Sequence, residues 1–251
     1  MSTPAFDRGV TPAPEPAPVP GAEIHHAHRD VTGGWLRPAV FGAMDGLVSN
    51  FALIAGVAAG SGNSSIVVLA GLAGLTAGAF SMAAGEYTSV ASQGELARAE
   101  IAIEREELRR RPDAERNELA QLYVERGVEP DLAQEVARQL SRDPDQALEI
   151  HVREELGLDP RDLPSPYVAA VSSFLSFAVG AAVPVLPYLL GATSLVPALI
   201  VALLGLFLTG AAVSTVTSRS WLYSGTRQLV LGGVAAAITY LLGTVVGLGV
   251  G

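Results

Sequence analysis

The chain has 251 residues, of which 49% are hydrophobic, and its formal net charge at pH 7 is −9. The charges are concentrated in one block, and beyond Asp162 the sequence holds no acidic residue and only two arginines, Arg219 and Arg227. This composition is typical of a membrane protein, and its acidic balance favours cations over nucleic acid as partners. Because the chain has no cysteine, disulfides and thiolate metal sites are excluded.

Residues 1–35 are predicted to form a disordered tail. The segment 11–23 is rich in proline and alanine and lacks the apolar stretch of a signal peptide, so membrane insertion must rely on internal segments. Three histidines, His25, His26 and His28, precede the first apolar run. They either capture metal loosely or are incidental residues of the tail.

Five later stretches, each of about 20 residues, are apolar enough to cross a bilayer. Prolines at positions 184, 187 and 197 lie near span ends or at a kink, which a helical bundle tolerates. The sequence therefore predicts an all-α integral membrane protein, with transmembrane helices 1 and 2 in residues 36–91 and transmembrane helices 3–5 in residues 167–251. The five predicted spans are residues 38–60, 66–87, 167–190, 195–216 and 229–250.

Residues 92–166, here called the acidic module, are predicted to form a separate helical unit between the second and third spans. The helix of the second span meets no proline before position 112, so it is expected to continue out of the membrane. Prolines at helix starts and glycines after helix ends predict three further helices. The boundary residues are Arg110 for the first helix, Pro112, Arg126 and Gly127 for the second, Pro130 for the third, and Asp143, Pro144 and Gly157 for the fourth.

The orientation in the membrane follows from the arginines. Every arginine lies before residue 38, in the acidic module or in the loop 217–228, whereas the loops 61–65 and 191–194 carry no charge. Positive loops remain on the cytoplasmic side, so the tail and the acidic module are expected in the cytoplasm. Five spans then place the C-terminus on the opposite side.

Asp45 is an isolated carboxylate in an apolar span, where such a group costs roughly 3 kcal/mol and usually faces a cavity, a partner or an ion. Asp45 should lie about 10 Å and Met82 about 8 Å from the same side of the membrane, so the two can face one another. Glu86 follows Met82 by one helical turn, nearer to water. A thioether with a carboxylate suits a borderline ion such as Fe²⁺. The structural alternatives are a hydrogen bond for Asp45 and gap filling for Met82.

The acidic module carries three pairs of potential metal ligands, each pair spaced to share one helix face. Carboxylates and a histidine that converge from facing helices build the di-metal sites of ferritin-like proteins. The alternative is that these residues form an ordinary solvated surface. The pairs are Glu104 with Glu107, Glu115 with Glu118, and His151 with Glu155.

From residue 28 onward the chain resembles the vacuolar iron transporter family. The resemblance rests on "GAMDGLVSNFALIAG" in the first span, "AGAFSMAAGEY" in the second, the Glu-rich insertion, and "REELGLDP" before the third span. It implies a five-span homodimer that moves Fe²⁺ out of the cytosol in exchange for protons. It also implies that the transport path uses Asp45 and Met82, and that the metal ligands of the acidic module are Glu104, Glu107, Glu115, Glu118 and Glu155.

Two positions depart from the family pattern. The family often has methionine where this chain has His151, and histidine still binds Fe²⁺ or Zn²⁺ but takes up a proton at low pH. The family often has a glutamate where this chain has Gly74, which puts the number of ligands within the membrane in question. Glu86 is a candidate substitute, although it lies three turns away and nearer the interface.

We therefore expect a homodimeric, proton-coupled exporter of Fe²⁺ in a bacterial-type inner membrane, with Mn²⁺, Co²⁺ and Zn²⁺ left open as alternative substrates. No nucleophile triad or nucleotide motif is present, so neither an enzyme nor a prosthetic group is expected. The rival interpretation is a membrane-anchored metal-binding or ferroxidase protein without transport. Glycine pairs spaced for close helix packing occur at Gly56 and Gly60, Gly74 and Gly78, and Gly243 and Gly247.

Overall fold

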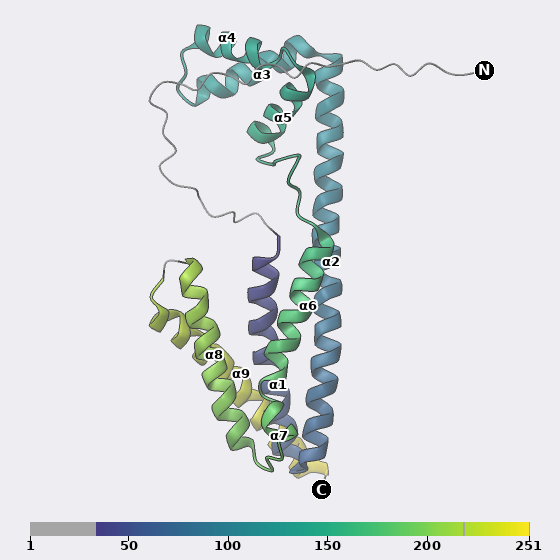
Figure 1. Ribbon diagram of the computed structural model, residues 1–251, viewed down its shortest axis with the longest axis vertical. Helices are drawn as coiled ribbons and strands as arrows, with labels where there is room; N and C mark the ends of the chain where they lie inside the picture. The colour runs from purple at the N-terminus through teal and green to yellow at the C-terminus, as the bar shows by residue number, and fades with distance from the viewer. Residues whose placement is uncertain (1–33, 218, 251) are drawn as a thin grey trace, which may run out of the picture. The chain divides into compact units, whose positions relative to one another are not determined.

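The computed structural model describes residues 34–217 and 219–250, so most of the predicted tail, including His25, His26 and His28, lies outside the described residues. Within the described ranges every regular element is an α-helix (Figure 1). The helices are α1 (Leu36–Ser61), α2 (Ser64–Arg110), α3 (Pro112–Glu125), α4 (Pro130–Leu140), α5 (Pro144–Glu155), α6 (Pro166–Ala182), α7 (Leu186–Leu189), α8 (Leu195–Thr217) and α9 (Trp221–Val250).

Four of these helices, α1, α2, α8 and α9, are long and apolar enough to cross a membrane. The shorter apolar helix α6 has 17 residues. It ends at Ala182, and Pro184 lies between it and the single turn of α7, which has Pro187 near its start, so these two helices divide the predicted third span. Many large apolar side chains on α2, α6, α8 and α9 are exposed, as expected for helices whose outer faces contact lipid.

The last helix begins about two turns before the predicted last span, so the predicted loop before it was too long. The expected loop 217–228 is helical from Trp221 onward, because α9 begins eight residues before the apolar run. Aromatic side chains occupy this added segment, and the Arg227 guanidinium carbon lies 5.9 Å from the centre of the Tyr223 ring. Aromatic and arginine side chains are typical of a helix that extends through the membrane–water interface.

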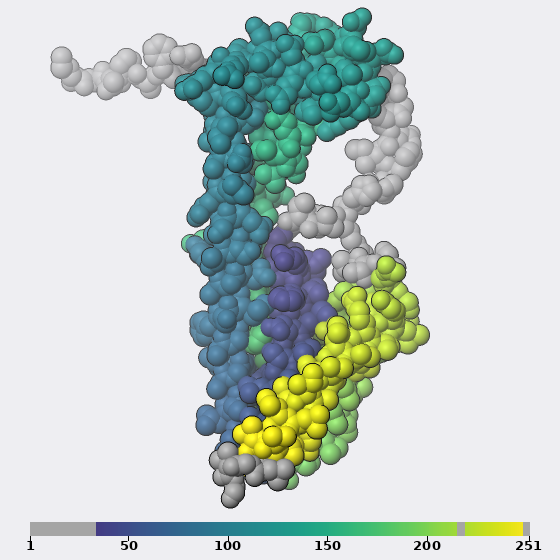
Figure 2. All heavy atoms as spheres, turned by 180° about the vertical axis from the view of Figure 1, so that it is seen from behind, coloured from purple at the N-terminus to yellow at the C-terminus, as the bar shows by residue number. Residues whose placement is uncertain are grey.

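Helix α1 is the centre of the membrane-embedded part, because it packs against α2, α6, α8 and α9. Its side chains Leu47, Phe51 and Ile54 are at most 1% exposed. Figure 2 shows α9, in yellow, lying across α1, in purple. This central position means that a polar side chain on the inner face of α1 is enclosed by helices.

Glycines allow α1 and α9 to approach closely. A Cβ atom added to Gly60 would lie 3.0 Å from the carbonyl oxygen of Gly243, and one added to Gly56 would lie 3.0 Å from that of Thr239. The Thr239 hydroxyl donates a hydrogen bond of 2.7 Å to the Ala52 carbonyl oxygen. Two of the three predicted glycine pairs therefore pack against each other within one chain.

In the acidic module the four helices begin and end close to the predicted positions. Helix α2 runs unbroken for 47 residues, about 70 Å, which is far longer than a bilayer requires. At α5 the Asp143 carboxylate accepts hydrogen bonds from the backbone N–H groups of Asp145 and Gln146. Behind α3 and α5, Gly127 and Gly157 adopt positive φ angles, which end the helices.

Candidate functional site

The interior of the acidic module is set by apolar contacts between α2 and α5. Ile101 of α2 and Leu148 and Val152 of α5 form a buried cluster, against which Leu108 packs. Glu104 lies between Ile101 and Leu108 on the same face of α2, so the packing that buries these side chains also directs its carboxylate inward.

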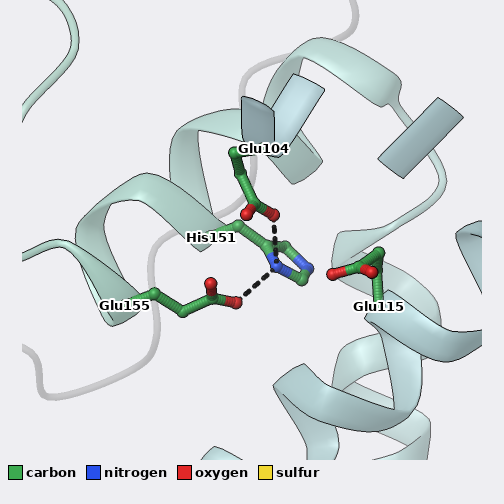
Figure 3. A group of neighbouring side chains, drawn as sticks. All are labelled: Glu104, Glu115, His151 and Glu155. Carbon is green, nitrogen blue, oxygen red and sulfur yellow. Dashed lines mark hydrogen bonds and ion pairs between the residues drawn. The ribbon is translucent and has the colours of Figure 1, made fainter. Parts of the chain in front are cut away.

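The same packing buries His151, which lies between Leu148 and Val152 in the sequence of α5. Its side chain is fully buried. Its Nδ1 atom lies 3.1 Å from Glu104 Oε1 and 2.9 Å from Glu155 Oε1. Glu115 of α3 approaches the other edge of the imidazole ring (Figure 3). The histidine therefore lies at the centre of three carboxylates that come from three helices.

These four residues form a donor set suited to a divalent metal ion. One ligand atom from each of Glu104, Glu115, His151 and Glu155 lies within 4.8 Å of the others. Within the described residues, His151 Nε2 is buried without a hydrogen-bond partner. Buried polar atoms are rarely left in this state, and a cation bound among the carboxylates would satisfy it. Three carboxylates with one imidazole match Fe²⁺, Mn²⁺ or Zn²⁺ better than a soft ion.

The electrostatics of the cluster also favour a cation. Burial and the charge of Glu155 raise the pKa of Glu104 to about 7. Burial and the charge of Glu118 raise the pKa of Glu155 to about 7. The pKa of Glu115 is raised by the same two causes. Because each carboxylate resists ionisation next to the others, a divalent ion that neutralises them would be bound in exchange for protons.

Glu107 and Glu118, the other two predicted ligands, have exposed side chains outside this set of four. They remain close enough for their charges to contribute to the raised pKa values of Glu115 and Glu155. A neighbouring carboxylate, Glu106, forms ion pairs with Arg109 and Arg110 at the surface. The structure thus separates an inner set of four residues from two outer carboxylates.

Within the membrane-spanning helices, the structure brings Asp45 and Met82 to one cavity of about 320 Å³. The cavity is thus lined by a carboxylate from α1 and a thioether from α2. Glu86 is partly exposed and is not one of the described residues that line this cavity. The cavity is also lined by Ser49, Asn50, Leu53, Gly74, Gly78, Ser81 and Phe177.

Sequence reasoning did not single out Asn50, although its side chain lines this cavity and is only 2% exposed. Its Nδ2 atom donates hydrogen bonds to the carbonyl oxygens of Gly71 on α2 and Ala181 on α6. The available signal was a strongly polar side chain within an apolar span, the same signal that identified Asp45.

The chain is similar in sequence to a known protein family and to several named proteins. Residues 36–244 match the model of the VIT family. Over 221 residues the chain is 40% identical to a vacuolar iron transporter of Acanthamoeba castellanii, covering 84% of this chain and 78% of that protein. It is 32% identical over 226 residues to vacuolar iron transporter 1 of Arabidopsis thaliana, with 88% and 90% covered. It is 33% identical over 220 residues to the protein of the same name from Oryza sativa subsp. japonica, with 86% and 87% covered.

Proposed function

Because the chain belongs to the VIT family, we propose that it exports Fe²⁺ from the cytoplasm across the membrane in exchange for protons. Mn²⁺ is the first alternative substrate, and Co²⁺ and Zn²⁺ follow. The proposal includes five spans, with α6 and α7 together as the third, and a homodimer as the working unit. The acidic module then lies in the cytoplasm, where it collects the metal.

The observation that carries this proposal is the set of buried Glu104, Glu115 and His151 with the partly exposed Glu155. Its ligand atoms are close enough for one ion, and the buried His151 Nε2 has no hydrogen-bond partner among the described residues. The raised pKa values of Glu104 and Glu155 mean that metal binding near neutral pH releases protons. Such a site would load metal when the cytoplasmic concentration rises and release it as the carboxylates are protonated.

The cavity that contains Asp45 and Met82 supports transport over simple anchoring. A membrane anchor has no use for a carboxylate within its apolar span, since that group weakens insertion. The oxygen of Asp45 and the sulfur of Met82 together provide a mixed hard and soft environment, which suits Fe²⁺. We assign these two residues to the transport path, with Glu86 at its cytoplasmic mouth.

The set of Glu104, Glu115, His151 and Glu155 alone would also suit a membrane-anchored ferroxidase. The experiment must therefore separate metal binding from metal transport. The full chain is reconstituted in liposomes that hold a fluorescent metal indicator and a pH indicator. Fe²⁺ is added under an oxygen-free, reducing atmosphere, and Mn²⁺ is added in parallel. We expect metal influx coupled to an opposite flow of protons, abolished in liposomes without protein. Metal binding or Fe²⁺ oxidation without influx would overturn the proposal and favour the anchored protein.

A further inference from the structure

Asn50 lies deeper in the membrane than the Asp45–Met82 pair. It follows Asp45 by five residues on α1, which is about 7.5 Å along the helix axis. If Asp45 lies about 10 Å from the membrane surface, Asn50 lies about 17 Å from it, close to the middle of a bilayer whose apolar core is about 30 Å thick. Both side chains line the same cavity.

The hydrogen bonds of Asn50 fix which way its amide group points. Its Nδ2 atom donates to the carbonyl oxygens of Gly71, at 3.1 Å, and of Ala181, at 2.6 Å. A flipped amide would place its oxygen against two carbonyl oxygens, which repel it, so the orientation follows from the network. The Oδ1 atom is buried and accepts no hydrogen bond from any described residue.

Gly74 provides the space that Oδ1 faces. A Cβ atom added to Gly74 would lie 2.8 Å from Asn50 Oδ1 and 2.6 Å from Leu53 Cδ2, closer than side chains tolerate. Both Gly74 and Leu53 line the cavity. A residue other than glycine here would displace the amide oxygen, so Gly74 and Asn50 act together.

The helix break after α6 lies beside the same residue. In a continuous helix the Ala181 carbonyl would accept from the N–H of Val185, but that N–H donates to the Ala182 carbonyl instead. Asn50 satisfies the Ala181 carbonyl in its place. Broken helices at this depth occur where the irregular backbone is enclosed by protein or lines a polar cavity, and transporters use them to bind ions near the bilayer midplane.

We propose that Asn50 Oδ1 is a metal-contacting group of the transport path, which receives the divalent cation from Asp45 and Met82 near the middle of the membrane. The role rests on the proposed transport function. A neutral amide oxygen is a ligand for hard and borderline divalent ions, and it holds them less tightly than a carboxylate. A neutral contact at the deepest point would let the ion pass without becoming trapped.

The chemistry of the ligand gives a selective test. Loss of a hard oxygen should slow a hard ion such as Mn²⁺ more than Zn²⁺, which accepts softer ligands. In proteoliposomes, Asn50→Ser is expected to lower the maximal rate of Mn²⁺ influx about tenfold and that of Zn²⁺ about two- to threefold. Serine is a smaller polar residue and places no oxygen at the position of Oδ1.

Gly74→Ala provides an independent test, because it leaves Asn50 in the chain and displaces its oxygen. It should shift the ratio of Mn²⁺ to Zn²⁺ influx in the same direction. Ser173→Ala is the matched control, since Ser173 is a fully buried polar residue of α6 that is not among the described residues lining the cavity. This variant should keep the wild-type ratio.

The outcomes distinguish this role from the transport path itself. Equal loss of Mn²⁺ and Zn²⁺ influx in both Asn50→Ser and Gly74→Ala would mean that Asn50 only holds the helices together, which overturns the inference. An unchanged Mn²⁺ to Zn²⁺ ratio with full rates would overturn it as well. Wild-type influx from a folded Asp45→Asn protein would instead overturn the proposed path, whatever the variants at Asn50 do.

Discussion

Glu104 and His151 come from α2 and α5, yet Glu104 Oε1 lies 3.1 Å from His151 Nδ1 in the interior of the acidic module. The contact ties the end of the long helix α2 to the last helix of the module. Because α2 is unbroken from Ser64 to Arg110, an ion that draws these side chains together acts on a helix that also carries Met82. Helix α2 thus joins the four-residue set of the acidic module to the cavity that Asp45 and Met82 line.

The inner and outer carboxylates should differ in their contribution to metal affinity. Glu104→Gln or Glu115→Gln is expected to weaken Mn²⁺ binding about tenfold or more, because each removes a buried charged ligand. Glu107→Gln and Glu118→Gln should weaken it only about two- to threefold, through a loss of charge that salt screens. Calorimetry on the full chain in detergent measures these affinities.

The control for this series is Glu135→Gln on α4, whose exposed carboxylate pairs with Arg138 and lies outside the cluster. Its Mn²⁺ affinity should equal that of the wild type. Equal losses at the inner and outer positions would mean that the inner set of four residues does not form the site.

The metal-free cluster should make the acidic module less stable as the pH rises. Folding raises the pKa values of Glu104 and Glu155 from 4.5 to about 7, so in this window the folded chain binds more protons than the unfolded chain. The free energy of unfolding therefore falls between pH 5 and pH 8, by about 1 kcal/mol per carboxylate after solvent screening. Hydrogen exchange at the amides of α5, in the presence of a chelator, measures this change.

Two comparisons test the cause of this pH dependence. Glu104→Gln removes one of the two carboxylates and should remove about half of the effect. Saturating metal should reverse it, adding about 2.7 kcal/mol at one hundred times the dissociation constant. Protection of α5 that does not change with pH in the metal-free protein would contradict the raised pKa values.

His151 should contribute to the preference of the site among divalent ions. His151→Met replaces an imidazole nitrogen by a soft thioether sulfur, so the affinity for Mn²⁺, a hard ion, should fall more than the affinity for Zn²⁺, which accepts softer ligands. Calorimetry on the full chain in detergent measures both affinities. Affinities equal to those of the wild type for both ions would show that His151 does not bind the ion.

The helices of the acidic module could be predicted because their boundaries are marked locally. Pro112, Pro130 and Pro144 each occupy the first turn of a helix, and Asp143 caps the last one. The start of α9 was missed, since no proline marks it and the helix extends beyond the apolar run. A pattern of hydrophobicity locates the membrane-embedded part of a helix, whereas its polar extension depends on packing and on the interface.

The four residues of the inner set were among those predicted from the sequence, but the sequence did not show which of the predicted residues are buried. Helical spacing places Glu104 and Glu107 on one face of α2, and only the packing of α5 on α2 decides that Glu104 is buried while Glu107 is exposed. Burial of His151 likewise depends on contacts between segments far apart in the chain. Asn50 could have been found by treating its amide in the apolar run as the carboxylate of Asp45 was treated.

The membrane cavity gives the last prediction, which concerns Asp45. Asp45→Asn keeps the size of the side chain and removes its charge, so the helix bundle should remain folded. Without that charge the cavity loses its only formally anionic lining group among the described residues. Because the carboxylate offsets much of the cost of bringing a divalent ion into the membrane, Fe²⁺ influx into proteoliposomes should fall about a hundredfold. Metal binding by the acidic module, measured in the same preparation, should stay at the wild-type level and serves as the internal control. Wild-type influx in this variant would remove Asp45 from the transport path.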